Sequence, residues 1–276
     1  MLDVILLFRE ALLGALVIAL GCSVLGVYVV LRRIVFVGAA LAQLSSAGIA
    51  LAIFLEALGV GWGWVTGHVV LAFLVTLAGV VFFALHGARY RVPPDAGLGM
   101  AYVVAGAAGV LLIAQAAGAD VHDLFLQGNI LGITRADALL LLMVVGTVLA
   151  VHALLYKEFL FVSFDPDMAR TLGYRVTGWN LLLYLTLAIV IAVAMQSAGV
   201  LLVFNFLVLP AVTGLLLGRG MAGVFGWAIA SGLLAAAAGF ALSIPLDLPT
   251  GPAIVAVSGI LALLAWLARL AWPALR

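Results

Sequence analysis

The chain has 276 residues, of which 67% are hydrophobic and only 8% are charged, whereas an ordinary soluble domain is roughly 25% charged. This composition excludes a soluble globular protein. The formal net charge is +1, and the 12 Lys and Arg residues stand singly or in pairs, which leaves no basic surface for nucleic acid. The single cysteine, Cys22, excludes a disulfide framework and a thiolate metal cluster.

Charged and turn-forming residues divide the chain into nine apolar runs, at residues 11–31, 35–55, 64–85, 98–117, 138–156, 179–196, 200–217, 224–243 and 253–271. Each is close to the about 20 residues that a membrane-spanning helix needs. We therefore expect an all-α polytopic membrane protein with a single transmembrane domain over residues 1–276. The sixth and seventh runs are separated only by residues 196–199, so a tight turn and one long broken helix are both possible there.

The basic residues predict the orientation, because Lys and Arg in short loops stay in the cytosol. Nine spans with an external N-terminus and a cytosolic C-terminus place ten basic residues inside and only Arg9 and Arg135 outside. Joining the sixth and seventh runs would put the later positive charges on the wrong side. No charged residue falls in the middle third of a run, which counts against an ion-coupled carrier with an intramembrane carboxylate.

The longest inner loop, residues 163–174, carries the start and stop signals of a short helix. Asp165 is suited to cap its N-terminus and Pro166 to occupy its first position, while Asp167 favours the positive end of the helix dipole. Gly173 supplies a left-handed stop. A helix of about seven residues, roughly 10 Å long, is too short to cross a bilayer. It is either a helical turn in a surface loop or a docking element for a cytosolic partner.

Residues 163–173, Ser-Phe-Asp-Pro-Asp-Met-Ala-Arg-Thr-Leu-Gly, resemble the coupling-helix motif in the permease subunits of zinc and manganese ATP-binding-cassette importers. Residues 29–38, 199–211 and 247–252 resemble further blocks of the same family in the same order, so the resemblance runs from about residue 11 to 270. It implies that a cytosolic helix at about 165–173 meets the ATPase through eight residues: Asp165, Pro166, Asp167, Met168, Ala169, Arg170, Leu172 and Gly173.

The resemblance also implies the partners of the chain. Such permeases pair as homodimers in a bacterial or archaeal cytoplasmic membrane, above two cytosolic ATP-binding subunits, and an external metal-binding protein delivers the cargo. The chain lacks a phosphate loop that ends in Gly-Lys-Ser or Gly-Lys-Thr, and its only lysine is Lys157. We therefore expect no ATP hydrolysis and no bound cofactor in this chain, with a divalent metal ion as cargo.

The sequence departs from the family at positions that could hold a metal. Family members usually carry an Asp and, four residues later, a His early in the second span, where this chain has Ala39 and Gln43. An external Gly-Asp-Ile-Leu reads here as residues 128–131, with Asn129 in place of the Asp. We therefore predict a translocation path of neutral polar groups, lined by Gln43, Ser45, Ser46, Asn205 and Asn129. The alternative for these residues is hydrogen bonding between helices.

Neutral amides select zinc poorly, so either the ion is not held at mid-membrane or the cargo is another cation or a chelate. Asp120, His122 and Asp123 form an external cluster with suitable metal ligands, which could equally be a solvated loop or a contact for the binding protein. His68, near the outer end of the third run, is a metal ligand or a packed side chain. A secondary carrier that works alone, and an exporter or scaffold of the same fold, remain the other hypotheses.

Overall fold

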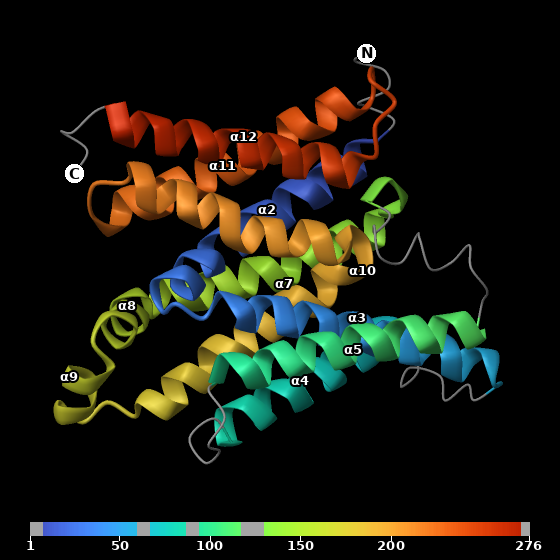
Figure 1. The fold of residues 1–276 in the computed structure, drawn as a ribbon, viewed down its shortest axis with the longest axis horizontal. Helices are drawn as coiled ribbons and strands as arrows, with labels where there is room; N and C mark the ends of the chain where they lie inside the picture. The colour runs from blue at the N-terminus through green and yellow to red at the C-terminus, as the bar shows by residue number, and fades with distance from the viewer. Residues whose placement is uncertain (1–7, 60–66, 87–93, 117–129, 272–276) are drawn as a thin grey trace.

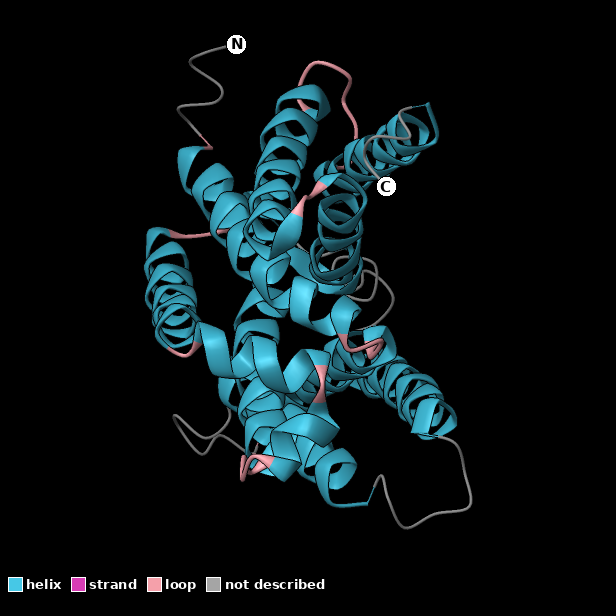
Figure 2. Cartoon of the chain, turned by 90° about the vertical axis from the view of Figure 1, so that its left-hand side faces the viewer, coloured by secondary structure: helices cyan, strands magenta, loops and turns pink. Residues whose placement is uncertain are grey.

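The structure, a computed structural model, describes residues 8–59, 67–86, 94–116 and 130–271, and all regular structure within them is helical (Figures 1 and 2). This confirms the predicted all-α fold. The elements are α2 (Arg9–Leu31), α3 (Val35–Ala57), α4 (His68–His86), α5 (Pro94–Ala116), the short 3-10 helix η2 (Ile130–Gly132), α7 (Arg135–Leu154), α8 (Tyr156–Phe164), α9 (Pro166–Thr171), α10 (Val176–Leu217), α11 (Gly220–Ser243) and α12 (Thr250–Ala271).

Seven of the described helices are long and apolar enough to cross a membrane, and the apolar stretch His68–Phe82 in α4 is shorter. The longest of them, α10, has 42 residues and is interrupted at Gly199, whose backbone angles are φ 74° and ψ 169°. A positive φ of this kind is open to glycine at little cost. With α10 divided at Gly199, the described residues contain nine apolar helical segments, one at each of the nine apolar runs.

The chain reverses direction at Gly199. Asn180 in the first half of α10 hydrogen-bonds to Arg32, and Leu207 in the second half lies against Gly26. A straight helix would hold Asn180 and Leu207 about 40 Å apart, whereas Gly26 and Arg32 are only about 9 Å apart along α2. In Figure 1 the yellow first half and the orange second half accordingly run in opposite directions. Of the two possibilities left open at residues 196–199, the tight turn is therefore the one observed.

Small residues allow the central helices to approach closely. A Cβ atom on Gly26 of α2 would overlap the backbone carbonyl of Leu207, and one on Gly48 of α3 would lie 2.6 Å from the Cα of Ala72 in α4. Contacts of this kind hold helices together in a membrane, where lipid is as apolar as the side chains. The core lies between α2, α3 and α10, with α11 and α12 on one side and α4 and α5 on the other (Figure 1).

One end of the bundle, on the left in Figure 1, collects the end of α2, the α10–α11 connection, the end of α12 and the short helices α8 and α9. The basic residues Arg32, Arg219 and Arg269 belong to these segments. Arg269 Nη1 donates to the carbonyl oxygen of Leu215 at 2.9 Å, so its charge lies at the C-terminal end of α10, where a cation is favoured by the helix dipole.

Candidate functional site

Helix α9 has the ends that the sequence predicts. The Asp165 carboxylate accepts a hydrogen bond from the backbone N–H of Met168 at 2.8 Å, and Pro166 occupies the first turn. At the other end, the N–H of Gly173 donates to the carbonyl of Arg170 at 3.0 Å, with Gly173 at φ 86°. The helix spans residues 166–171, slightly less than the predicted segment of about 165–173.

One face of α9 is fixed to the bundle and the rest is exposed. Ala169 is completely buried in a small apolar cluster with Val162 and Val176. Met168 and Leu172 are 51% and 60% exposed, although both are large and apolar. Asp167 and Arg170 form an exposed ion pair at 2.7 Å, which contributes little to stability in such a position. The helix is therefore anchored to the bundle through Ala169 and exposes apolar and charged side chains on its other faces.

Arg32 joins the end of α2 to the segments on both sides of α9. Its Nε donates to Ser163 Oγ at 2.8 Å, two residues before the cap of α9, and its Nη1 donates to Asn180 Oδ1 near the start of α10. Ser163 Oγ in turn donates to the carbonyl of Phe159. We refer to Arg32, Ser163 and Asn180 as the Arg32 joint. The Arg32 joint therefore links the end of α2 to the segments that come before and after α9.

The sequence did not point to the Arg32 joint. Ser163 and Asn180 are 131 and 148 residues away from Arg32 along the chain, and no local spacing brings them together. The only available signal was the pair of basic residues Arg32 and Arg33 at the end of a predicted span.

The structure places the predicted path residues of α3 against different neighbours. The side chain of Gln43 is half-buried and lies beside Gly106 of α5, since a Cβ on Gly106 would be 3.7 Å from its amide group. Ser45 and Ser46 are buried, and Ser45 Oγ has no hydrogen-bond partner among the described residues. Gln43 is therefore the member of this set that is open to the surface of the single chain.

Asn205 lies at another interface. It is 5% exposed, and its Nδ2 donates to Ser258 Oγ of α12 at 3.0 Å, while its Oδ1 has no partner among the described residues. The structure thus gives Asn205 an interhelical hydrogen bond and does not bring it into a hydrogen-bonded group with Gln43. Asn129 falls outside the described residues.

The described residues contain no group of three or more His, Cys, Asp and Glu side chains that could hold a metal ion. Asp120, His122 and Asp123 lie outside the described part of the chain. His68 pairs with Glu56, with 3.7 Å between His68 Nε2 and Glu56 Oε2, and both side chains are partly exposed. These two groups alone make an incomplete set of metal ligands.

His152 is buried in the bundle, 2% exposed, where the ring stacks on Phe159 with 4.2 Å between centroids. Its Nε2 lies 3.0 Å from Thr186 Oγ1, and this hydroxyl donates to the carbonyl of Leu183. The hydroxyl therefore accepts from an Nε2–H of the ring. Nδ1 has no hydrogen-bond partner among the described residues.

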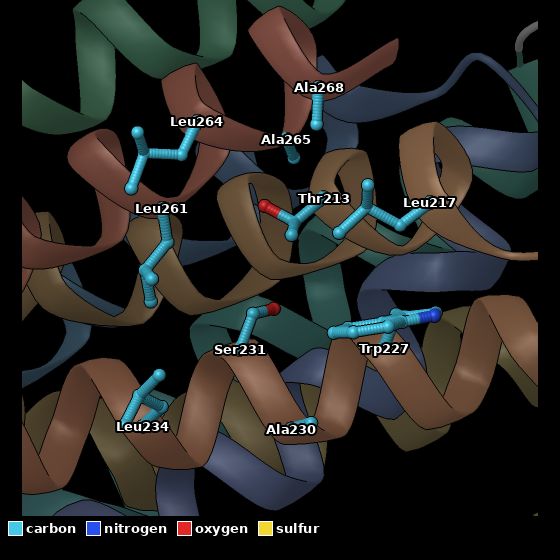
Figure 3. A pocket seen from close by; sticks show the side chains of 10 residues that line it. All are labelled: Thr213, Leu217, Trp227, Ala230, Ser231, Leu234, Leu261, Leu264, Ala265 and Ala268. Carbon is cyan, nitrogen blue, oxygen red and sulfur yellow. The ribbon is translucent and has the colours of Figure 1, made fainter. Parts of the chain in front are cut away.

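An apolar groove of about 280 Å³ lies between α10, α11 and α12 (Figure 3). Eight of its ten lining residues carry no hydroxyl, and the other two are Thr213 and Ser231. Both hydroxyls donate to carbonyls of their own helices, at 2.9 Å to Leu209 and 3.1 Å to Ala228. The side chains that line the groove are therefore mostly apolar.

The sequence is similar over nearly its whole length to a family of membrane transport proteins. The model of the ABC 3 transport family matches residues 5–269. The manganese transport system membrane protein MntC of Halalkalibacterium halodurans is 30% identical over 94% of this chain and 86% of its own length. The manganese import system permease protein ScaB of Streptococcus parasanguinis is 29% identical over 94% of this chain and 89% of its own length.

The fold is also found in a solved structure. The structure described as PsaBC from Streptococcus pneumoniae in complex with Fab matches with a TM-score of 0.82, at 23% identity, over 94% of this chain and 90% of the other. At this identity the likeness establishes the shared fold.

Proposed function

This chain belongs to the ABC 3 transport family, and we propose that it is the membrane-spanning subunit of an ATP-driven importer for a divalent metal ion. In this proposal two copies of the chain pair in a bacterial or archaeal cytoplasmic membrane, with separate cytosolic ATP-binding subunits below them. An external metal-binding protein delivers the cargo. The chain itself binds no cofactor.

The observation that carries the proposal is helix α9 and its connection to the bundle. Exposed Met168 and Leu172 give it an apolar surface, which in a soluble environment marks a protein contact. The exposed pair of Asp167 and Arg170 can fix the register of that contact, since charges at an interface contribute specificity more than affinity. The Arg32 joint then supplies the route by which closure of an ATPase could move α2 and α10.

The distribution of charge supports the orientation with an external N-terminus. The end that carries α8 and α9 also carries Arg32, Arg219 and Arg269, and basic residues favour the cytosolic side. In this orientation α9 lies in the cytosol, where an ATPase can reach it.

We propose manganese as the first cargo to test, because relatives of similar length are named manganese transport proteins. Ala39 and Gln43 stand where the family usually has an Asp and a His, so another hard cation or a metal chelate is the alternative cargo. Gln43, half-buried beside Gly106, is the residue of α3 that we propose for the path in the dimer. Path roles for Ser45, Ser46 and Asn205 remain predictions.

The test is uptake of radioactive manganese into proteoliposomes that contain the permease, its ATPase and the binding protein. We expect uptake with ATP and none with a non-hydrolysable nucleotide. Uptake by the permease alone under a proton gradient would instead establish a secondary carrier. Competition by zinc, magnesium or a metal chelate added outside the same vesicles would identify the preferred cargo, because that cargo should inhibit manganese uptake most strongly.

A further inference from the structure

A small polar pocket lies where the start of α7 meets the interruption in α10. It has a volume of about 200 Å³ and is lined by Gly132, Ile133, Asp137, Gln196 and Ser197. Gln196 and Ser197 come just before Gly199, where α10 turns back. Figure 1 shows the start of α7 and the turn in α10 at the end of the bundle opposite α9, so the residues that line the pocket belong to that end.

The polar atoms around this pocket are only partly used. Ser197 is 8% exposed, and its hydroxyl has no hydrogen-bond partner among the described residues. Gln196 is exposed and likewise makes no hydrogen bond to a described residue. The Ser197 hydroxyl borders the open space of the pocket, so a ligand in the pocket can reach it.

Asp137 adds the negative charge. Its Oδ2 accepts from the backbone N–H of Thr134 at 3.0 Å and from the Thr134 hydroxyl at 2.6 Å, which completes the capping box of α7. No hydrogen bond from a described residue reaches Oδ1. Arg135 is a basic residue two positions before Asp137, but it is exposed and does not line the pocket. One carboxylate oxygen thus remains available beside the amide of Gln196 and the hydroxyl of Ser197.

We propose that this pocket is an entry site for a hard divalent cation, which is held by oxygen ligands from Asp137, Gln196 and Ser197 and by water. This proposal rests on the function proposed above and locates its first cargo site outside α3. Carboxylate, amide and hydroxyl oxygens suit Mn²⁺ and Mg²⁺. Zn²⁺ is disfavoured, because it prefers imidazole and thiolate ligands.

The test is Mn²⁺ binding to the complex of permease and ATPase in lipid nanodiscs without nucleotide, measured from the electron paramagnetic resonance signal of free Mn²⁺. Asp137→Asn keeps an oxygen that can accept from Thr134 but removes the charge. We expect it to weaken Mn²⁺ binding by about tenfold or more, since the charge of the ligand set governs affinity for hard cations. Gln196→Glu adds a carboxylate and should strengthen binding. Both variants are checked for an unchanged elution volume of the complex.

Glu56→Gln is the matched control, because Glu56 is an acidic residue in the last turn of α3 that lines no part of this pocket. Wild-type affinity in Asp137→Asn, or equal losses in Glu56→Gln and Asp137→Asn, would overturn the site. ATP-driven manganese uptake by the wild-type complex is measured in parallel. If that uptake is present while the pocket variants bind Mn²⁺ normally, the pocket proposal fails and the importer function stands.

Discussion

Replacement of Arg32 by Gln removes the two hydrogen bonds of the Arg32 joint while retaining a polar side chain. Hydrogen bonds to a charged group contribute about 1.5–3 kcal/mol each, and because Arg32 is half-buried the lower value is appropriate. Two such bonds, to Ser163 Oγ and Asn180 Oδ1, give about 3 kcal/mol. This corresponds to roughly a hundredfold change in the equilibrium between the joined and separated segments.

If the Arg32 joint transmits the motion of α9, its loss should uncouple the two activities of the complex. We expect Arg32→Gln to lower manganese taken up per ATP hydrolysed by at least about tenfold, within the hundredfold that the bond energies allow, while ATP hydrolysis continues. Arg32→Lys should recover part of the coupling, because an ammonium group can reach one acceptor but cannot bridge both. The assay is parallel measurement of uptake and phosphate release in proteoliposomes.

Arg33 provides the matched control. It is adjacent to Arg32, carries the same charge and is exposed, so Arg33→Gln removes a cytosolic positive charge without touching the joint. Its coupling ratio should equal that of the wild type. The reasoning would be refuted if Arg32→Gln retained wild-type coupling, or if Arg33→Gln lost coupling to the same degree.

Three other predictions concern single positions. In Gly173→Ala, the alanine must adopt a φ of 86° at a cost of about 1–2 kcal/mol, and we expect less uptake per ATP hydrolysed. Gly178→Ala is the control, because its new methyl group meets only an ordinary contact, and its uptake per ATP should equal that of the wild type. Equal uptake per ATP in the two variants would show that α9 takes no part in coupling. His152→Phe preserves the ring stack and should leave the pH dependence of uptake unchanged, and a lost pH dependence would indicate proton coupling. Gly26→Ala should destabilise the permease by about 1–3 kcal/mol in thermal unfolding, while Gly146→Ala, which has open space, should melt like the wild type.

The short helix α9 could be predicted from the sequence because its signals are local. Asp165, Pro166 and Gly173 act on backbone groups within a few residues of themselves. The local sequence is therefore enough to predict where this helix begins and ends. The membrane-spanning helices could also be predicted from the apolar runs, since each helix must be apolar over most of its length to lie in lipid. The reversal at Gly199 was predictable only in part, because a glycine permits a turn without requiring one.

The arrangement of polar side chains within the bundle could not be predicted in the same way. Gln43 and Asn205 are at similar depth in their helices, but depth says nothing about rotation around the helix axis. Gln43 lies beside Gly106 in α5, whereas Asn205 donates to Ser258 in α12. Which neighbour a side chain meets depends on the packing of helices distant in sequence, and a single sequence does not contain that information.

The most direct measurement of the central claim is the accessibility of Leu172, which is 60% exposed beside α9. A Leu172→Cys variant can be labelled selectively with a membrane-impermeant maleimide, because the natural Cys22 is completely buried. We predict labelling in inverted membrane vesicles, none in right-side-out vesicles, and protection when the ATPase is bound. Labelling from the external face, or labelling that the ATPase does not reduce, would contradict the account.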